Sequence, residues 1–144
     1  MKTLVMAILV IGVVFVSGCT QIAPSDIEMT YISYGVETGV HPSSTTWVVS
    51  EGVLTIEEIR GEEITTKTIT LSQDQLNELA AAIRWANPLY LENEYEDPTI
   101  ADCGVDSYSF VFEDTIKSIT VKCGAPPALS DISRLLSWFR SGSR

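Results

Sequence analysis

The chain has 144 residues, of which 45% are hydrophobic and 19% charged, and its 9 basic and 19 acidic residues give a formal net charge of −10. An acidic protein repels phosphate backbones, so this charge excludes nucleic acid as a partner. The same negative charge repels the protein from an anionic membrane surface.

The first segment of the chain is typical of a secretion signal. One basic residue, Lys2, precedes an apolar run over Leu4–Val16 that only Gly12 interrupts. A membrane-spanning helix needs about 20 apolar residues, so this run is too short to span comfortably. Its length suits the hydrophobic region of a secretory signal, and the absence of twin arginines favours the general secretory route.

The end of this run, Val16-Ser17-Gly18-Cys19, resembles the lipobox of prokaryotic membrane lipoproteins. The resemblance implies cleavage between Gly18 and Cys19 and a thioether-linked diacylglyceryl group on the Cys19 thiol. It also implies a place on the extracytoplasmic face of the cell membrane or envelope. Cysteine suits this chemistry because its thiolate is a strong nucleophile. An ordinary signal peptide cut nearby, or an uncleaved anchor, would leave Cys19 without a role.

The remainder of the chain has the size of one domain. Without residues 1–18 it has 126 residues, and because Lys2 is lost, 8 basic residues remain against 19 acidic ones. That length is enough for a substantial core. We expect residues 19–27 to form the lipidated N-terminus and a short polar tether, residues 28–140 a single domain, and residues 141–144 a frayed tail.

The compartment predicts the role of the other two cysteines. With Cys19 lipidated, Cys103 and Cys123 are an even pair in an oxidising environment, which favours a disulfide. In the chain-entropy model, closing a loop of about 20 residues stabilises the fold by roughly 3 kcal/mol. Free thiols or a metal site are the alternatives. The metal site has little support, because there is no CxxC pair and the single histidine, His41, has no partner.

Alternating and β-branched segments predict the strands of a sheet. Ile59 falls out of phase with Leu54 and Ile56, which predicts a bulge near Glu57 and Glu58 or fraying of that strand's end. Before the first helix we expect a loop over residues 36–45 and strands over Glu28–Gly35, Thr46–Ser50, Val53–Arg60 and Glu63–Leu71. A second hairpin is expected over Asp106–Phe112 and Thr115–Lys122.

Two segments have helical spacing. Ser72 and Gln75 form a capping box before the first, and Asn87-Pro88 stops it. The second begins near Pro127 or Ser130. The apolar stripes consist of Leu76, Leu79, Ala80 and Ile83 in the first helix, and of Leu129, Ile132, Leu135, Leu136 and Phe139 in the second.

The order of these elements predicts an α+β domain. We expect an antiparallel sheet of about five to six strands, a meander plus a hairpin, with two amphipathic helices packed on one face. The pattern loosely resembles small secreted prokaryotic domains of unknown function, and that resemblance implies no activity.

Acidic residues gather between the first helix and the second hairpin, with no basic residue among them. Glu92, Glu94 and Glu96 alternate, so an extended segment would place them on one solvent-facing side. A solvated acidic loop, weak calcium binding and a basic protein partner are all open, although the spacing matches no known calcium loop. The candidate partner or cation surface comprises Glu92, Glu94, Glu96, Asp97 and Asp102.

Catalytic motifs are hard to find in this chain. His41 is the single imidazole, and no G-x-S-x-G, phosphate-binding loop or dinucleotide fingerprint is present. We therefore expect no catalytic residue, cofactor or metal. The aromatic residues Trp47, Tyr90, Tyr95 and Trp138 belong either to the core or to a sugar- or peptide-binding platform.

Three functions are compatible with the sequence. The first is a non-catalytic binding module that engages another envelope protein through the open sheet face or the acidic loop. The second is a structural or protease-inhibiting lipoprotein with a contact loop at Gly39–Ser44. The third, an enzyme, has the least support, with His41 and Asp106 as the residues to substitute.

The anchor and the disulfide are testable together by intact mass of protein isolated from membranes. We expect a chain that begins at Cys19, carries a diacylglyceryl group, and takes up two alkyl groups only after reduction. A lipid-free chain, or one with Cys103 and Cys123 already open to alkylation, would contradict this prediction.

Overall fold

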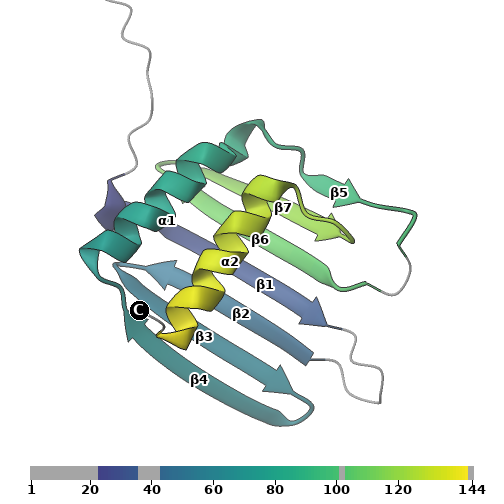
Figure 1. The fold of residues 1–144 in the computed structure, drawn as a ribbon, viewed down its shortest axis with the longest axis horizontal. Helices are drawn as coiled ribbons and strands as arrows, with labels where there is room; N and C mark the ends of the chain where they lie inside the picture. The colour runs from purple at the N-terminus through teal and green to yellow at the C-terminus, as the bar shows by residue number, and fades with distance from the viewer. Residues whose placement is uncertain (1–22, 36–42, 101–102, 143–144) are drawn as a thin grey trace, which may run out of the picture.

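The computed structural model describes residues 23–35, 43–100 and 103–142. The signal, the lipobox, His41 and Asp102 lie outside the described residues. Figure 1 shows a twisted sheet with two α-helices lying across it. In chain order the elements are η1 (Pro24–Asp26), β1 (Glu28–Gly35), β2 (Ser43–Ser50), β3 (Val53–Arg60), β4 (Glu63–Thr70), α1 (Gln73–Ala86), η2 (Pro88–Tyr90), β5 (Glu94–Glu96), β6 (Val105–Phe112), β7 (Thr115–Lys122) and α2 (Pro127–Ser141).

The sheet is mixed and has seven strands in the order β4-β3-β2-β1-β6-β7-β5. Strands β1 to β4 lie side by side in chain order, and the β6–β7 hairpin pairs with β1 on its other side. All of these pairs are antiparallel, whereas β5 runs parallel to β7. The sheet therefore has one or two strands more than the expected five to six, and it is mixed rather than antiparallel throughout.

The additional strand is β5, which was not apparent from the sequence because it has only three residues, Glu94–Glu96. Two of these are acidic, so propensity argues against a strand. Tertiary contacts hold it instead. The Thr120 amide donates to the Asn93 carbonyl at 2.8 Å, and the Asp97 amide donates to the Lys122 carbonyl at 3.1 Å.

Strand β3 contains no bulge, which corrects the expectation near Glu57 and Glu58. Its eight residues pair in continuous register with both β2 and β4. Ile59 is out of phase because it lies on the side of the sheet opposite Leu54. Glu58 takes the inner position there, since its carboxylate forms an ion pair with Arg140 of α2.

Every second side chain is buried in strands β1, β2, β3, β6 and β7. Met29 and Tyr31 are 2% and 6% exposed in β1, and the residues opposite them in neighbouring strands are also buried. The helices lie across the sheet in Figure 1 and contribute their apolar stripes to the same core cluster. The helix residues in this cluster are Leu76, Leu79, Ala80, Ile83, Ala86, Leu129, Ile132, Leu136 and Phe139.

The caps predicted for α1 are confirmed. The Gln75 amide donates to the Ser72 hydroxyl at 3.3 Å, and the Ser72 amide donates to the Gln75 side chain at 2.9 Å. Asn87 ends the helix in the left-handed conformation with φ of 47°, and Pro88 follows. The last turn of α2 is tied to the sheet, because Lys67 donates to the Arg140 carbonyl at 2.9 Å.

Ser72→Ala removes the hydroxyl that accepts the Gln75 amide. We expect the free energy of unfolding to fall by about 1 kcal/mol, the usual value of an N-cap. Urea unfolding followed by circular dichroism measures it. Ser137→Ala, at an exposed position inside α2, is the matched control and should change stability little. Equal effects of the two substitutions would contradict the capping role.

Candidate functional site

Strand β5 places two of the predicted acidic residues beside one cation. Glu94 and Glu96 lie opposite Thr120 and Lys122 of β7 in the parallel register. The Lys122 ammonium is 2.9 Å from a Glu94 carboxylate oxygen and 4.0 Å from one of Glu96. The hydrogen bond that Lys122 donates to Glu94, together with the charges of both carboxylates, raises the pKa of Lys122. Part of the negative charge here is therefore already neutralised.

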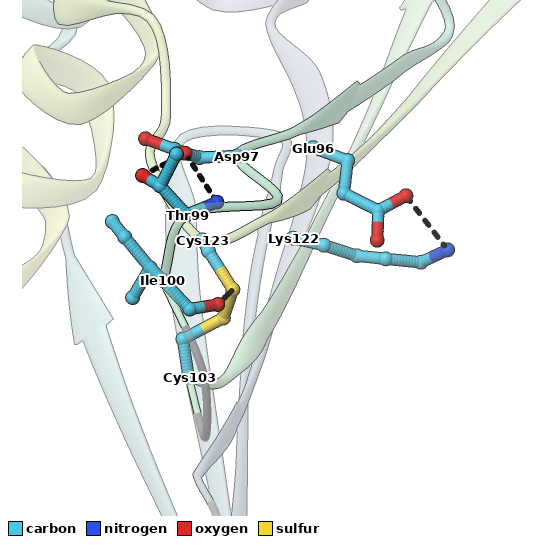
Figure 2. The surroundings of a disulfide bond; sticks show 7 residues. All are labelled: Glu96, Asp97, Thr99, Ile100, Cys103, Lys122 and Cys123. Carbon is cyan, nitrogen blue, oxygen red and sulfur yellow. Dashed lines mark hydrogen bonds and ion pairs between the residues drawn. A yellow bond between two sulfur atoms is a disulfide. The ribbon is translucent and has the colours of Figure 1, made fainter.

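Asp97 is turned away from this group and toward its own loop, as Figure 2 shows. Its carboxylate accepts the Thr99 amide at 2.9 Å and the Thr99 hydroxyl at 2.5 Å. The hydroxyl bond first, and the amide bond second, hold the pKa of Asp97 below its ordinary value. Glu92 instead donates its backbone amide to the Tyr95 hydroxyl at 3.0 Å.

The described acidic residues therefore do not converge on one point. Within residues 23–35, 43–100 and 103–142 no group of three or more His, Cys, Asp or Glu side chains is arranged to hold a metal ion. We call Glu92, Glu94, Glu96 and Asp97, which lie in or beside β5, the acidic ridge; Asp102 is outside the described residues. Calcium binding and a basic protein partner both stay predictions.

A disulfide joins Cys103 to Cys123 next to this ridge (Figure 2). It links the chain just before β6 to the chain just after β7, with Cα atoms 5.4 Å apart. Gly104 permits the approach, because a Cβ there would lie 2.4 Å from the Tyr34 carbonyl oxygen of β1. The bond therefore closes the end of the β6–β7 hairpin where the chain also crosses to β5.

A second candidate surface is the side of the sheet formed by the strand residues that alternate with the buried core residues. We call this side the open face. In the three central strands β2, β1 and β6 this face is half-buried or exposed. Glu28, at the start of β1, is its one charged residue in those strands. The other members are Ser44, Thr46, Val48, Ser50, Thr30, Ile32, Tyr34, Val105, Ser107, Ser109 and Val111.

The open face is flat rather than hollow. A depression over Glu28, Thr30, Val48 and Ser109 has a volume of about 160 Å³. Two depressions on the core side of the sheet, near Glu58 and the β3–β4 edge, have volumes of about 140 and 180 Å³. Pockets for small ligands usually have volumes of about 300 to 1,000 Å³. The shapes of these described surfaces suit a macromolecule better than a small ligand.

The aromatic residues do not form the platform that the sequence left open. Trp47 is 7% exposed in the core, and Trp138 and Tyr95 pack partly buried against it. Tyr90 alone of the four is strongly exposed, at 85%. Sequence reasoning missed Trp85, which is 78% exposed. Its position off the Leu76–Leu79–Ile83 stripe was the available signal.

The interior of the sheet places polar groups among the aromatic rings. Burial first, and the negative charge of Asp106 second, raise the pKa of Tyr31. Burial also raises the pKa of Tyr108 well above its ordinary value. These tyrosines are therefore neutral at physiological pH and serve packing. His41 lies outside the described residues, so no geometry relates it to Asp106.

Comparison with known proteins leaves the function to be argued from these surfaces. No protein-family model matches the chain, and no curated protein shows significant similarity to it. Among the described residues, no helix combines the length and apolar character needed to cross a membrane.

Replacing the disulfide by Cys103→Ser/Cys123→Ser frees a loop with a sequence separation of 20 residues. We expect the free energy of unfolding to fall by about 3 kcal/mol, since the unfolded chain gains conformational freedom. Urea unfolding measures it, and wild-type protein unfolded in reductant is the control that should match the variant. An unchanged midpoint in both samples would show that the bond contributes nothing.

Proposed function

We propose that this chain is a lipid-anchored binding module of the cell envelope that acts without catalysis. In this proposal both helices pack on one side of the sheet, and the open face on the other side contacts a protein partner. The lipobox-like segment at Val16–Cys19 supports the anchor.

The observation that carries the proposal is the near absence of charge at the centre of the open face, in strands β2, β1 and β6. The chain has 28 charged residues, of which 19 are acidic, yet the central strands present a single one, Glu28, on this side. Depletion of charged residues marks the centres of protein interfaces. Hydroxyl groups from serine and threonine supply hydrogen bonds there, and Tyr34 and Val111 supply exposed apolar area.

The size of the face is also appropriate. The six strands that are eight residues long, spaced about 4.8 Å apart with about 3.4 Å per residue, span roughly 800 Å². A standard protein interface covers about 800 Å² on each partner. In addition, no described strand pairs with the outer edge of β4, so its main-chain groups are available to a partner.

Inserting a charge at the centre of the open face tests the proposal. Ser109→Arg places a guanidinium between Thr30 and Ser118, where a partner would have to desolvate it. A photo-crosslinking residue at position 46 in the native host identifies the partner. We expect one defined envelope protein to be crosslinked, and Ser109→Arg to reduce that product about tenfold or more.

Asn77→Arg, exposed on α1, is the matched control and should leave the product unchanged. Urea unfolding must show that both variants stay folded. Glu94→Lys/Glu96→Lys tests the acidic ridge in the same assay. If the ridge variant abolishes the product while Ser109→Arg does not, the partner binds the ridge and the assignment to the open face is wrong.

A further inference from the structure

Three large apolar side chains are exposed where α1 ends and η2 begins. Trp85 is 78% exposed, Tyr90 85% and Leu89 44%. They lie within six residues of the chain, and we call them the aromatic patch. Such side chains are costly to leave in water, with a transfer free energy of about 25 cal/mol per Å².

The backbone holds the patch at the surface. Asn87 adopts the left-handed conformation that stops α1, and Pro88 is buried directly after it. The Tyr90 amide donates to the Asn87 carbonyl at 3.0 Å, and the Leu91 amide to the Pro88 carbonyl at 3.1 Å. This turn places Leu89 and Tyr90 just beyond the end of α1 that carries Trp85. All three residues lie outside the buried apolar stripe of the helix.

We propose that the aromatic patch enters the headgroup region of the membrane that holds the lipid anchor. This inference rests on the proposed anchor at Cys19. Tryptophan and tyrosine favour this region, because their rings are apolar while their N–H and O–H groups stay hydrated. A membrane surface is therefore the occupant whose chemistry this combination of residues fits.

The length of the tether brings the patch within reach of the membrane. Three residues separate Cys19 from Ala23, so the described chain starts four residue steps, at most about 14 Å, from the lipidated residue. The segment η1 packs against α1, and α1 leads to η2 along the same margin of the molecule (Figure 1). The helix has 14 residues and is about 21 Å long, so anchor and patch can touch one bilayer surface.

Charge does not drive this contact. The chain carries a net charge of −10, and residues 84–92 contain one basic residue, Arg84, and one acidic residue, Glu92. Attraction to anionic lipid is therefore weak, and burial of apolar area supplies the free energy. The contact should form on neutral phosphatidylcholine and change little between low and high salt.

The test uses the full lipidated chain reconstituted into phosphatidylcholine vesicles that contain brominated lipid, which quenches tryptophan emission at short range. We expect quenching of Trp85, identified by its loss in Trp85→Phe, since Trp47 is buried and Trp138 partly so.

Leu89→Ser/Tyr90→Ser keeps the Trp85 reporter but weakens insertion, and should lower the quenching by about twofold or more. Ile64→Ser/Ile116→Ser is the matched control, with exposed residues on the open face, and should change nothing.

Unquenched Trp85 in a chain whose intact mass shows the lipid would overturn the proposal while leaving the anchor in place. A chain without lipid would instead refute the anchor, and added vesicles would then still report on the patch by a blue shift of Trp85 emission. Shielding of Trp85 only when other envelope proteins are present would assign the patch to a protein and likewise overturn the proposal.

Discussion

The ring of Tyr31 stacks between Trp47 and Tyr108, with ring centroids 4.8 and 4.7 Å apart. The three residues are directly opposite one another in β2, β1 and β6, so this stack joins the meander to the β6–β7 hairpin. A slip of one residue in either pairing would move an aromatic ring to the open face and a hydroxyl residue into the core. The register of the central strands, and hence both faces of the sheet, depends on this contact.

The two edges of the sheet are treated differently. The β7 edge is covered by the segment that includes β5, where Lys117 donates to the Leu91 carbonyl and to Asn93, both at 2.6 Å. The disulfide closes the same region. On the other edge, β4 has every residue exposed except Ile69, and Lys67 ties it to α2. Natural sheets usually protect such an edge, so the bare edge is consistent with a surface meant for contact.

The proposed surfaces are compatible with each other. In the proposal that both helices pack on one side of the sheet, the aromatic patch at the end of α1 belongs to that side and the open face to the other. Contact of the patch with lipid would therefore leave the open face available to a partner. The acidic ridge lies along the β5 edge, where it would keep a protein of net charge −10 from settling on an anionic surface through that edge.

Elements whose cause is local could be predicted from the amino-acid sequence. The capping box of Ser72 and Gln75 is a local motif. The apolar stripe through Leu79 and the alternation around Tyr108 and Phe110 are periodic patterns. The structure confirms all three. The resemblance at Val16–Cys19 and the role it implies stay predictions. Features that depend on distant partners became visible only in the structure. Strand β5 is held by hydrogen bonds to Thr120 and Lys122, Glu58 is held inward by Arg140, and Trp85 is exposed because none of the described residues covers it. Periodicity records which side of a strand or helix is apolar, but not which surface lies opposite, because that is set by contacts between residues far apart in the chain.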